Sequence, residues 1–120
     1  MFYICPICGN VIYVMNGDIK RVRCCGKEML ELSANSEDAS VEKHVPYCSV
    51  NDKVVEVRIG ETIHPMEEEH YIMWIAMVSG EYVTIKHLSY SDSPEAILEY
   101  KEDAVIYAYC NKHGLWKKEL

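Results

Sequence analysis

The side chains that could do chemistry in this 120-residue chain are its six cysteines and five histidines. Cys5 and Cys8 form a Cys-x-x-Cys knuckle, and the following Gly9 lets the backbone turn beneath a metal ion. After fifteen further residues come the adjacent Cys24 and Cys25. Four thiolates at this spacing predict a tetrahedral metal site, and the ligand types leave both zinc and iron open. Because adjacent ligands cannot both reach ideal tetrahedral angles without strain, we expect the site to be distorted.

Two disulfides or a redox-active Cys-x-x-Cys pair are the alternative uses of these four cysteines. Disulfides suit an oxidising compartment, and a thioredoxin-like pair needs a βαβ pattern that the sequence lacks. A segment of about 35 residues buries too little apolar surface to fold without a metal or disulfides. In a reducing cytoplasm a metal site is therefore favoured.

The histidines carry the second chemical signal. Four of the five lie in short motifs, and these are His44, His64, His70 and His113. Taken singly, each is more often a surface or core residue than a ligand. Cys110-x-x-His113 is stronger, because one tight turn closed by Gly114 can aim a thiolate and an imidazole at one point. We expect His87 to be exposed on a strand and Cys48 to be a small buried side chain.

The first segment contains the elements that must position its cysteines. Val11–Val14 and Ile19–Val22 are β-type runs on either side of Asn16-Gly17, the dipeptide typical of a tight hairpin, so they predict a four-cysteine hairpin lobe. The polar stretch 33–40 is typical of a linker. We therefore expect two domains, a small lobe over residues 1–36 and a larger domain over residues 37–120.

The larger domain has the pattern of an antiparallel β-sandwich. Apolar residues alternate in Val54–Ile59, as a half-buried strand requires, whereas Glu95–Glu102 fits helical turns and a strand about equally well. About seven short strands in some 80 residues favour an all-β, immunoglobulin-like fold. The clearest strand-like runs are Val41–Val45, Lys53–Ile59, His70–Val78, Glu81–Leu88 and Ala104–Tyr109.

Composition limits the partners. The net charge of −7 has the wrong sign for a protein that binds nucleic acid by neutralising phosphates. The strongly apolar run Tyr71–Val78 is far shorter than the ~20 residues of a membrane span, and Met1–Gly9 places cysteines and a proline where a signal peptide needs apolar residues. We expect a cytoplasmic protein without nucleic-acid or membrane partners.

The motifs together resemble a known family. Tyr3–Leu32, with CPICGN and CCGKEM, resembles the iron-tetrathiolate module desulforedoxin. The segments EKHVP, HPMEEEHYI and YCNKHGLW follow in order, and the whole chain resembles the two-domain superoxide reductases called desulfoferrodoxins.

The resemblance implies a role for each matching residue. Four imidazoles and one axial sulfur would bind a catalytic ferrous ion with its sixth position open, and the ligands would be His44, His64, His70, His113 and Cys110. Glu42 matches the carboxylate that closes on the oxidised iron, and Lys43 matches the lysine beside the vacant position. The lobe would hold a second iron, or zinc in its place, on Cys5, Cys8, Cys24 and Cys25.

The implied activity is superoxide reduction, in which superoxide becomes hydrogen peroxide with electrons from rubredoxin or a similar donor. The resemblance also implies a homodimer. Two other classes of function fit the residues alone: a zinc-stapled binding module, and an electron carrier that uses only the tetrathiolate iron. A superoxide dismutase is a nearer alternative, which oxygen evolution would reveal.

Overall fold

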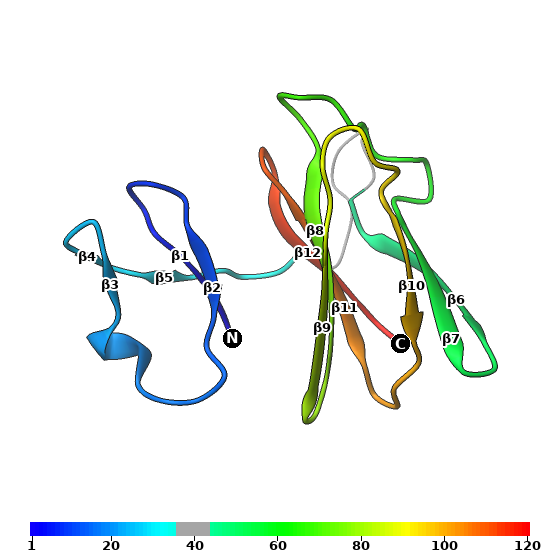
Figure 1. The fold of residues 1–120 in the computed structure, drawn as a ribbon, viewed down its shortest axis with the longest axis horizontal. Helices are drawn as coiled ribbons and strands as arrows, with labels where there is room; N and C mark the ends of the chain where they lie inside the picture. The colour runs from blue at the N-terminus through cyan, green and yellow to red at the C-terminus, as the bar shows by residue number, and fades with distance from the viewer. Residues whose placement is uncertain (36–43) are drawn as a thin grey trace. The chain divides into compact units, whose positions relative to one another are not determined.

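The structure is a computed structural model that describes residues 1–35 and 44–120 (Figure 1). The chain folds as two compact units, Met1–Ser33 and Ala34–Leu120. In the described residues, the regular elements of both units are β-strands, apart from one 3₁₀ helix in unit 1. The all-β class expected from the sequence is therefore confirmed.

Unit 1 contains a three-stranded antiparallel sheet in the order β2-β1-β5 and a short hairpin of β3 and β4. The rings of Phe2 and Tyr13 meet edge to face across β1 and β2, with centroids 5.1 Å apart. Its elements are β1 (Phe2–Ile4), β2 (Val11–Tyr13), a 3₁₀ helix (Ile19–Arg21), β3 (Arg23–Cys24), β4 (Lys27–Glu28) and β5 (Leu30–Glu31).

The hairpin expected across Asn16-Gly17 is wrong. The Asp18 side chain accepts a hydrogen bond of 3.0 Å from the Lys20 amide and so caps the 3₁₀ helix where a second strand was expected. Strand β2 pairs with β1 instead. The tight hairpin of this unit lies between β3 and β4, at the two-residue turn Cys25-Gly26.

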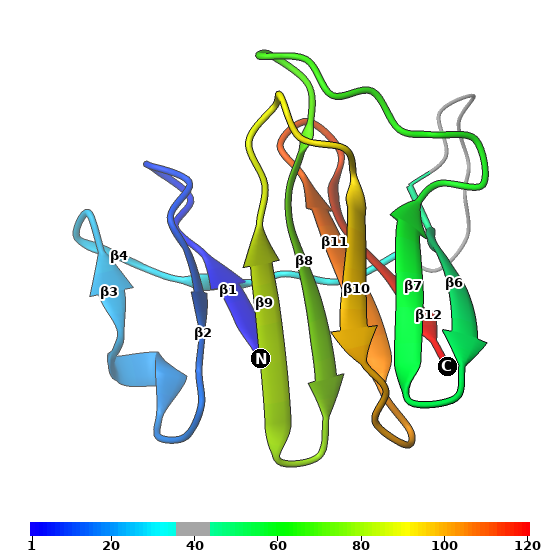
Figure 2. The same ribbon diagram turned by 45° about the vertical axis from the view of Figure 1, so that its right-hand side comes forward.

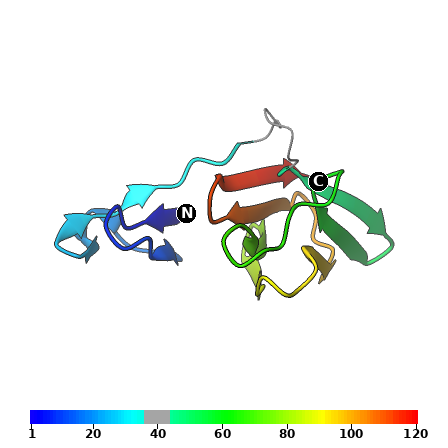
Figure 3. The same ribbon diagram turned by 90° about the horizontal axis from the view of Figure 1, so that it is seen from above.

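Unit 2 is a sandwich of two antiparallel sheets, ordered β10-β7-β6 and β12-β11-β8-β9. Figure 2 shows the strands of both sheets, and in Figure 3 the pairs β6–β7 and β11–β12 run side by side. The strands are β6 (Pro46–Asn51), β7 (Val54–Ile59), β8 (Ile72–Ser79), β9 (Tyr82–His87), β10 (Glu95–Glu99), β11 (Val105–Cys110) and β12 (Gly114–Glu119).

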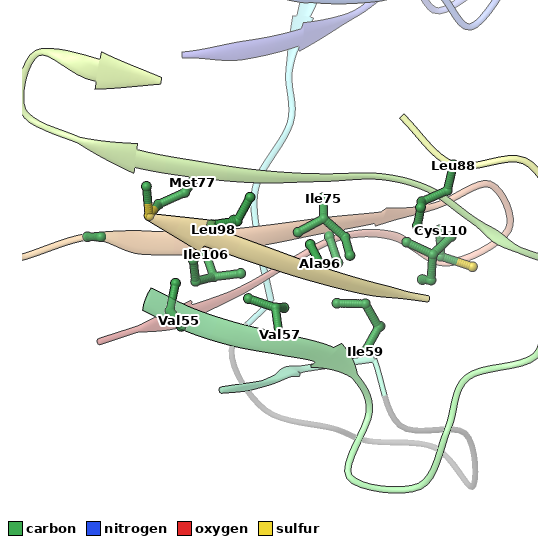
Figure 4. Close-up of a cluster of buried hydrophobic side chains, with 13 residues drawn as sticks. Val55, Val57, Ile59, Ile75, Met77, Leu88, Ala96, Leu98, Ile106 and Cys110 are labelled. Atoms are coloured by element: carbon green, nitrogen blue, oxygen red, sulfur yellow. The ribbon is translucent and has the colours of Figure 1, made fainter. Parts of the chain in front are cut away.

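The core of unit 2 lies between these sheets. Alternate residues of β7 and β10 face inward, and they meet Ile75 and Met77 of β8 and Ile106 of β11 (Figure 4). Burying each large aliphatic side chain contributes about 1.5–3 kcal/mol. Cys110 lies at one end of this cluster and is fully buried, so the core itself fixes one residue of the Cys110-x-x-His113 motif.

The strand pattern was largely predictable. Glu95–Glu99 is a strand, which decides the ambiguity over that segment, and seven strands are present in the described part of unit 2. Residues 41–43 of the expected first strand lie outside the described residues, whereas His44 and Val45 precede β6 without belonging to a strand. Strands β6 and β12 were not anticipated, because their sequences, PYCSVN and GLWKKE, lack a regular apolar alternation.

Candidate metal centres

The four cysteines of unit 1 form the first candidate centre. Their sulfur atoms all lie within 4.8 Å of one another, and Cys8 Sγ is 3.6 Å from Cys24 Sγ. Metal–sulfur bonds of about 2.3 Å in a tetrahedron place sulfur atoms about 3.8 Å apart, whereas a disulfide needs about 2.05 Å. All four thiols are free, so the geometry fits a metal ion and does not fit disulfides.

Local backbone structure aims these sulfurs at one point. The amides of Ile7 and Cys8 donate to Cys5 Sγ at 3.4 and 3.5 Å, and Gly9 closes the knuckle with a bond from its amide to the Cys5 carbonyl. On the other side, Cys25 adopts a φ of +52°, which is uncommon for a residue with a side chain. This left-handed conformation is the one that the two-residue turn Cys25-Gly26 requires, and the distortion of the metal site itself stays a prediction.

The four thiols influence each other's ionisation. Hydrogen bonds from the backbone amides, first that of Cys8, lower the pKa of Cys5 to about 6. Side-chain hydrogen bonds with Cys8 and Cys5 raise the pKa of Cys24 to about 12. The thiolate of Cys5 thus forms readily while Cys24 resists ionisation, and a bound cation would relieve that resistance.

The second candidate centre lies at one end of the unit 2 sandwich. Strand β6 begins beside the end of β7, where Pro46 faces Ile59, and β8 begins beside the end of β11, where Ile72 faces Cys110. The end of β11 and the loops at these strand ends bring together five residues whose ligand atoms all lie within 4.8 Å of one another: His44, His64, His70, Cys110 and His113.

A hydrogen bond to the backbone fixes the ring of His64. His64 Nδ1 lies 2.7 Å from the Pro65 carbonyl oxygen, which can only accept, so Nδ1 carries the hydrogen and Nε2 keeps its lone pair for a metal. His44 Nε2 lies 3.1 Å from His113 Nδ1. Both His44 and His64 are fully buried.

Trp116 supports the other side of the cluster. Its indole stacks on the His44 ring with centroids 4.7 Å apart and an interplanar angle of 16°. Its Nε1–H donates to the His113 carbonyl at 3.1 Å. From the sequence alone Trp116 has no role beyond the core, although its place in the motif YCNKHGLW is the signal that could have indicated one.

The chemistry of this donor set fits a single metal ion. Metal–nitrogen bonds of about 2.1 Å place adjacent ligand atoms about 3 Å apart and opposite ones about 4.2 Å apart. The distance between His44 Nε2 and His113 Nδ1 matches an adjacent pair, and Cys110 Sγ lies 3.8 Å from His113 Nδ1. Structural zinc sites usually take four donors, so five nitrogen and sulfur donors are one more than such a site needs. The same donor types also suit iron.

Comparison with known proteins shows the family of this chain. The family model described as desulfoferrodoxin matches residues 36–119. The chain belongs to the desulfoferrodoxin family. A "Desulfoferrodoxin" of Syntrophotalea carbinolica is 40% identical over 118 residues, covering 98% of this chain and 94% of the relative. A "Superoxide reductase" of Pyrococcus horikoshii is 36% identical over 112 residues, covering 77% of this chain and 97% of the relative.

Solved structures agree with this family. The superoxide reductase of Treponema pallidum is similar with a TM-score of 0.75 and 26% identity, covering 98% of this chain and 94% of that one. A superoxide reductase in the oxidised state has a TM-score of 0.56 and 27% identity over 72% of this chain and 94% of its own. The recognition of the family from its motifs is thus confirmed, and the relatives support an oxidoreductase.

The remaining expected residues lie apart from the two clusters or outside the described range. Glu42 and Lys43 lie outside the described residues. His87 is exposed on β9, as expected, and Cys48 is half-buried and packs against the core. In the described part of the chain, no helix is long and apolar enough to cross a membrane.

Arg58 is a further residue that sequence reasoning missed. Its guanidinium donates to the carbonyls of Gly60 and Glu61 at 3.4 and 3.0 Å and lies over the Tyr47 ring. The His64 amide in turn donates to the Ile59 carbonyl at 3.1 Å. Arg58 therefore holds the loop that carries His64, and an arginine that alternates outward along a strand gave no signal of this contact.

Proposed function

We propose that this protein is a superoxide reductase, in which superoxide takes up one electron and two protons and leaves as hydrogen peroxide. The observation that carries the proposal is the convergence of four imidazoles and one thiol at the end of an immunoglobulin-like sandwich. The relatives that bear the name superoxide reductase support it. The physiological role would be detoxification of superoxide.

The five residues of this cluster would be the ligands of a catalytic iron: His44, His64, His70, Cys110 and His113. An iron ion bound there would supply the one-electron change that no side chain of the cluster provides. Cys110 would hold the ion from the buried side, and as a thiolate it would supply an electron-rich donor to it. His113 is exposed, so a small anion can approach the cluster from solvent on that side.

Glu42 and Lys43 would act beside this cluster. Superoxide is an anion and the protein carries a net charge of −7, so a local cation is needed to attract it. At physiological salt, fields between exposed charges decay over about 8 Å, so a nearby lysine outweighs the total charge. Lys43 would attract superoxide, and Glu42 would bind the site after turnover and leave on reduction.

The proposal extends to metals and partners. The cysteines of unit 1 would hold an iron, or zinc in its place, that stabilises the lobe. The lobe over residues 1–36 would thus have a structural role, and the domain over residues 37–120 would carry out the reaction. A rubredoxin-like protein would deliver electrons to the catalytic site. The protein would act as a homodimer in the cytoplasm, in keeping with its family.

The stoichiometry of the reaction tests this function. The iron-loaded protein, supplied with reduced rubredoxin and a measured amount of superoxide, should form one peroxide per superoxide without oxygen. A dismutase would form one peroxide per two superoxide and evolve oxygen. Peroxide yield and oxygen, measured together, distinguish the two, and oxygen evolution would contradict the proposal.

Matched cysteine variants connect the activity to the cluster. Cys110→Ser should abolish turnover and remove the sulfur-to-iron absorption band that appears on oxidation, whereas Cys48→Ser should keep both. A colourless zinc module would lack every band, and an electron carrier would show only the bands of the four-cysteine centre. If Cys110→Ser kept the sulfur-to-iron band that appears on oxidation, Cys110 would be excluded as a ligand.

A further inference from the structure

Asn111 lies between Cys110 and His113, in the loop that follows β11. The regular pairing of β8 with β11 ends where Cys110 faces Ile72, after an irregularity between Tyr109 and Cys110. Beyond that point the backbone contact is weak, because the Asn111 amide reaches the Tyr71 carbonyl at 3.3 Å.

The side chain of Asn111 takes over where the backbone ladder stops. Its Oδ1 accepts from the Tyr71 amide at 3.0 Å, and its Nδ2 donates to the Glu69 carbonyl at 3.0 Å. The carboxamide thus offers one acceptor and one donor to the neighbouring chain, as a peptide group of a β-strand does. It extends the pairing of the two segments past the end of the strands.

The two groups that Asn111 binds flank His70 in the sequence. On the other side of the turn, Glu67 and His70 exchange backbone hydrogen bonds, each of 3.0 Å. The backbone of His70 is therefore held from both sides. Because the direction of a side chain follows from its backbone, Asn111 restricts where the His70 ring can point.

We propose that Asn111 is a positioning residue of the five-residue cluster, which joins the loop of His70 to the loop of Cys110 and His113. The proposal rests on the proposed function only in that the cluster binds a metal. Without Asn111, His70 would leave its place relative to the other donors more readily. Partners that orient metal ligands typically change metal affinity 10–100-fold.

Aspartate cannot replace asparagine in this role. A carboxylate at position 111 could still accept from the Tyr71 amide, but it has no hydrogen to donate to the Glu69 carbonyl. Two oxygen atoms would then face each other where Nδ2 and the carbonyl oxygen now lie 3.0 Å apart. Asn111→Asp is therefore expected to weaken the site at least as much as Asn111→Ala.

The test uses the full-length protein and Co²⁺ as the probe. Metal affinity and the Co²⁺ absorption spectrum are measured for wild type, Asn111→Ala, Asn111→Asp and the control Asn51→Ala, which changes an exposed asparagine at the end of β6. The four-cysteine centre is common to all four proteins, so differences between them report the five-residue cluster. Thermal unfolding without metal is recorded in parallel.

Both Asn111 variants should bind Co²⁺ at the cluster about tenfold or more weakly, with altered absorption bands, and Asn51→Ala should match wild type. A structural role alone would lower the unfolding temperature without metal and leave affinity and spectrum unchanged, which would overturn the inference. If wild type itself bound no Co²⁺ at the cluster, the proposed metal site would fail and the inference with it. Normal binding by wild type and both variants would refute the inference alone.

Discussion

Replacing His70 with alanine should remove most of the stability that a metal gives to unit 2. His70 supplies one of five candidate ligand atoms that lie within 4.8 Å of one another. Its backbone bonds to Glu67 do not involve the ring, so the substitution leaves the turn itself in place. The matched control is His87→Ala, which removes the exposed histidine on β9.

The size of the effect follows from linkage. Structural zinc sites with four ligands bind with about 10–16 kcal/mol, or about 3 kcal/mol per ligand, so losing one ligand should weaken binding about 100-fold. With free metal at about 1,000 times the wild-type Kd, binding stabilises wild type by about 4.1 kcal/mol. The variant would then have metal at only about 10 times its Kd, which gives about 1.4 kcal/mol.

The difference of about 2.7 kcal/mol is large for a unit of this size. Unit 2 extends over Ala34–Leu120, and a domain of 60–100 residues loses roughly 4–8 °C in unfolding temperature per kcal/mol. His70→Ala should therefore unfold about 10–20 °C below wild type with metal present. Without metal, the two should differ by only a few degrees.

Thermal unfolding followed by circular dichroism, with and without anaerobic Fe²⁺, measures this difference. Both proteins keep the four-cysteine centre, so the contribution of that centre cancels between them. His87→Ala should respond to metal as wild type does. If metal raised the unfolding temperature of His70→Ala as much as that of wild type, His70 would not be a ligand and the five-donor site would be wrong.

Two further predictions concern charge. Lys43→Ala should slow the reaction with superoxide and flatten the dependence of its rate on ionic strength, while the iron spectrum stays largely intact. Stopped-flow or pulse-radiolysis measurements across a salt series give these rates. If the rate of Lys43→Ala depended on salt as that of wild type does, Lys43 would not attract superoxide. Burial raises the pKa of Cys48 from 9.0 to about 11, so the folded state holds this proton more tightly than the unfolded state. The resulting stability is present below pH 9 and is lost as pH rises to 11; because the residue is partly exposed, its size should be about 1 kcal/mol or less. Unfolding by urea at pH 8 and pH 10.5 should show a smaller loss of stability for Cys48→Ala than for wild type, and equal losses would contradict the assignment.

The sequence identified the chemical groups of both centres but not the way they are held. The spacing of Cys5, Cys8, Cys24 and Cys25 was sufficient to predict a four-cysteine cluster. The hairpin at Asn16-Gly17 was wrong, because the Lys20 amide donates a local hydrogen bond to the Asp18 side chain, and this bond competes with strand pairing. Turn dipeptides report local preference, and here the preferred pairing partner of β2 lies at the N-terminus of the chain.

The histidines illustrate a second limit of sequence reasoning. Periodicity could not show that His44 and His113 meet, because the segments that carry them are 69 residues apart in the chain and belong to neighbouring ends of different strands. Family motifs supplied what periodicity could not. They did not single out Arg58, since its role depends on two backbone carbonyls whose position only the fold determines.

The supports of the five-residue cluster share one physical principle. Arg58, Asn111 and Trp116 each bind backbone carbonyls in a loop that carries a candidate ligand, and none of them is itself a candidate ligand. Hydrogen bonds to the backbone carbonyls orient a loop whatever side chains stand at its other positions. Substitutions at the three supports should therefore change metal affinity more than substitutions at exposed neighbours of the ligands whose side chains make no such bond to a described residue, such as Glu68 and Lys112.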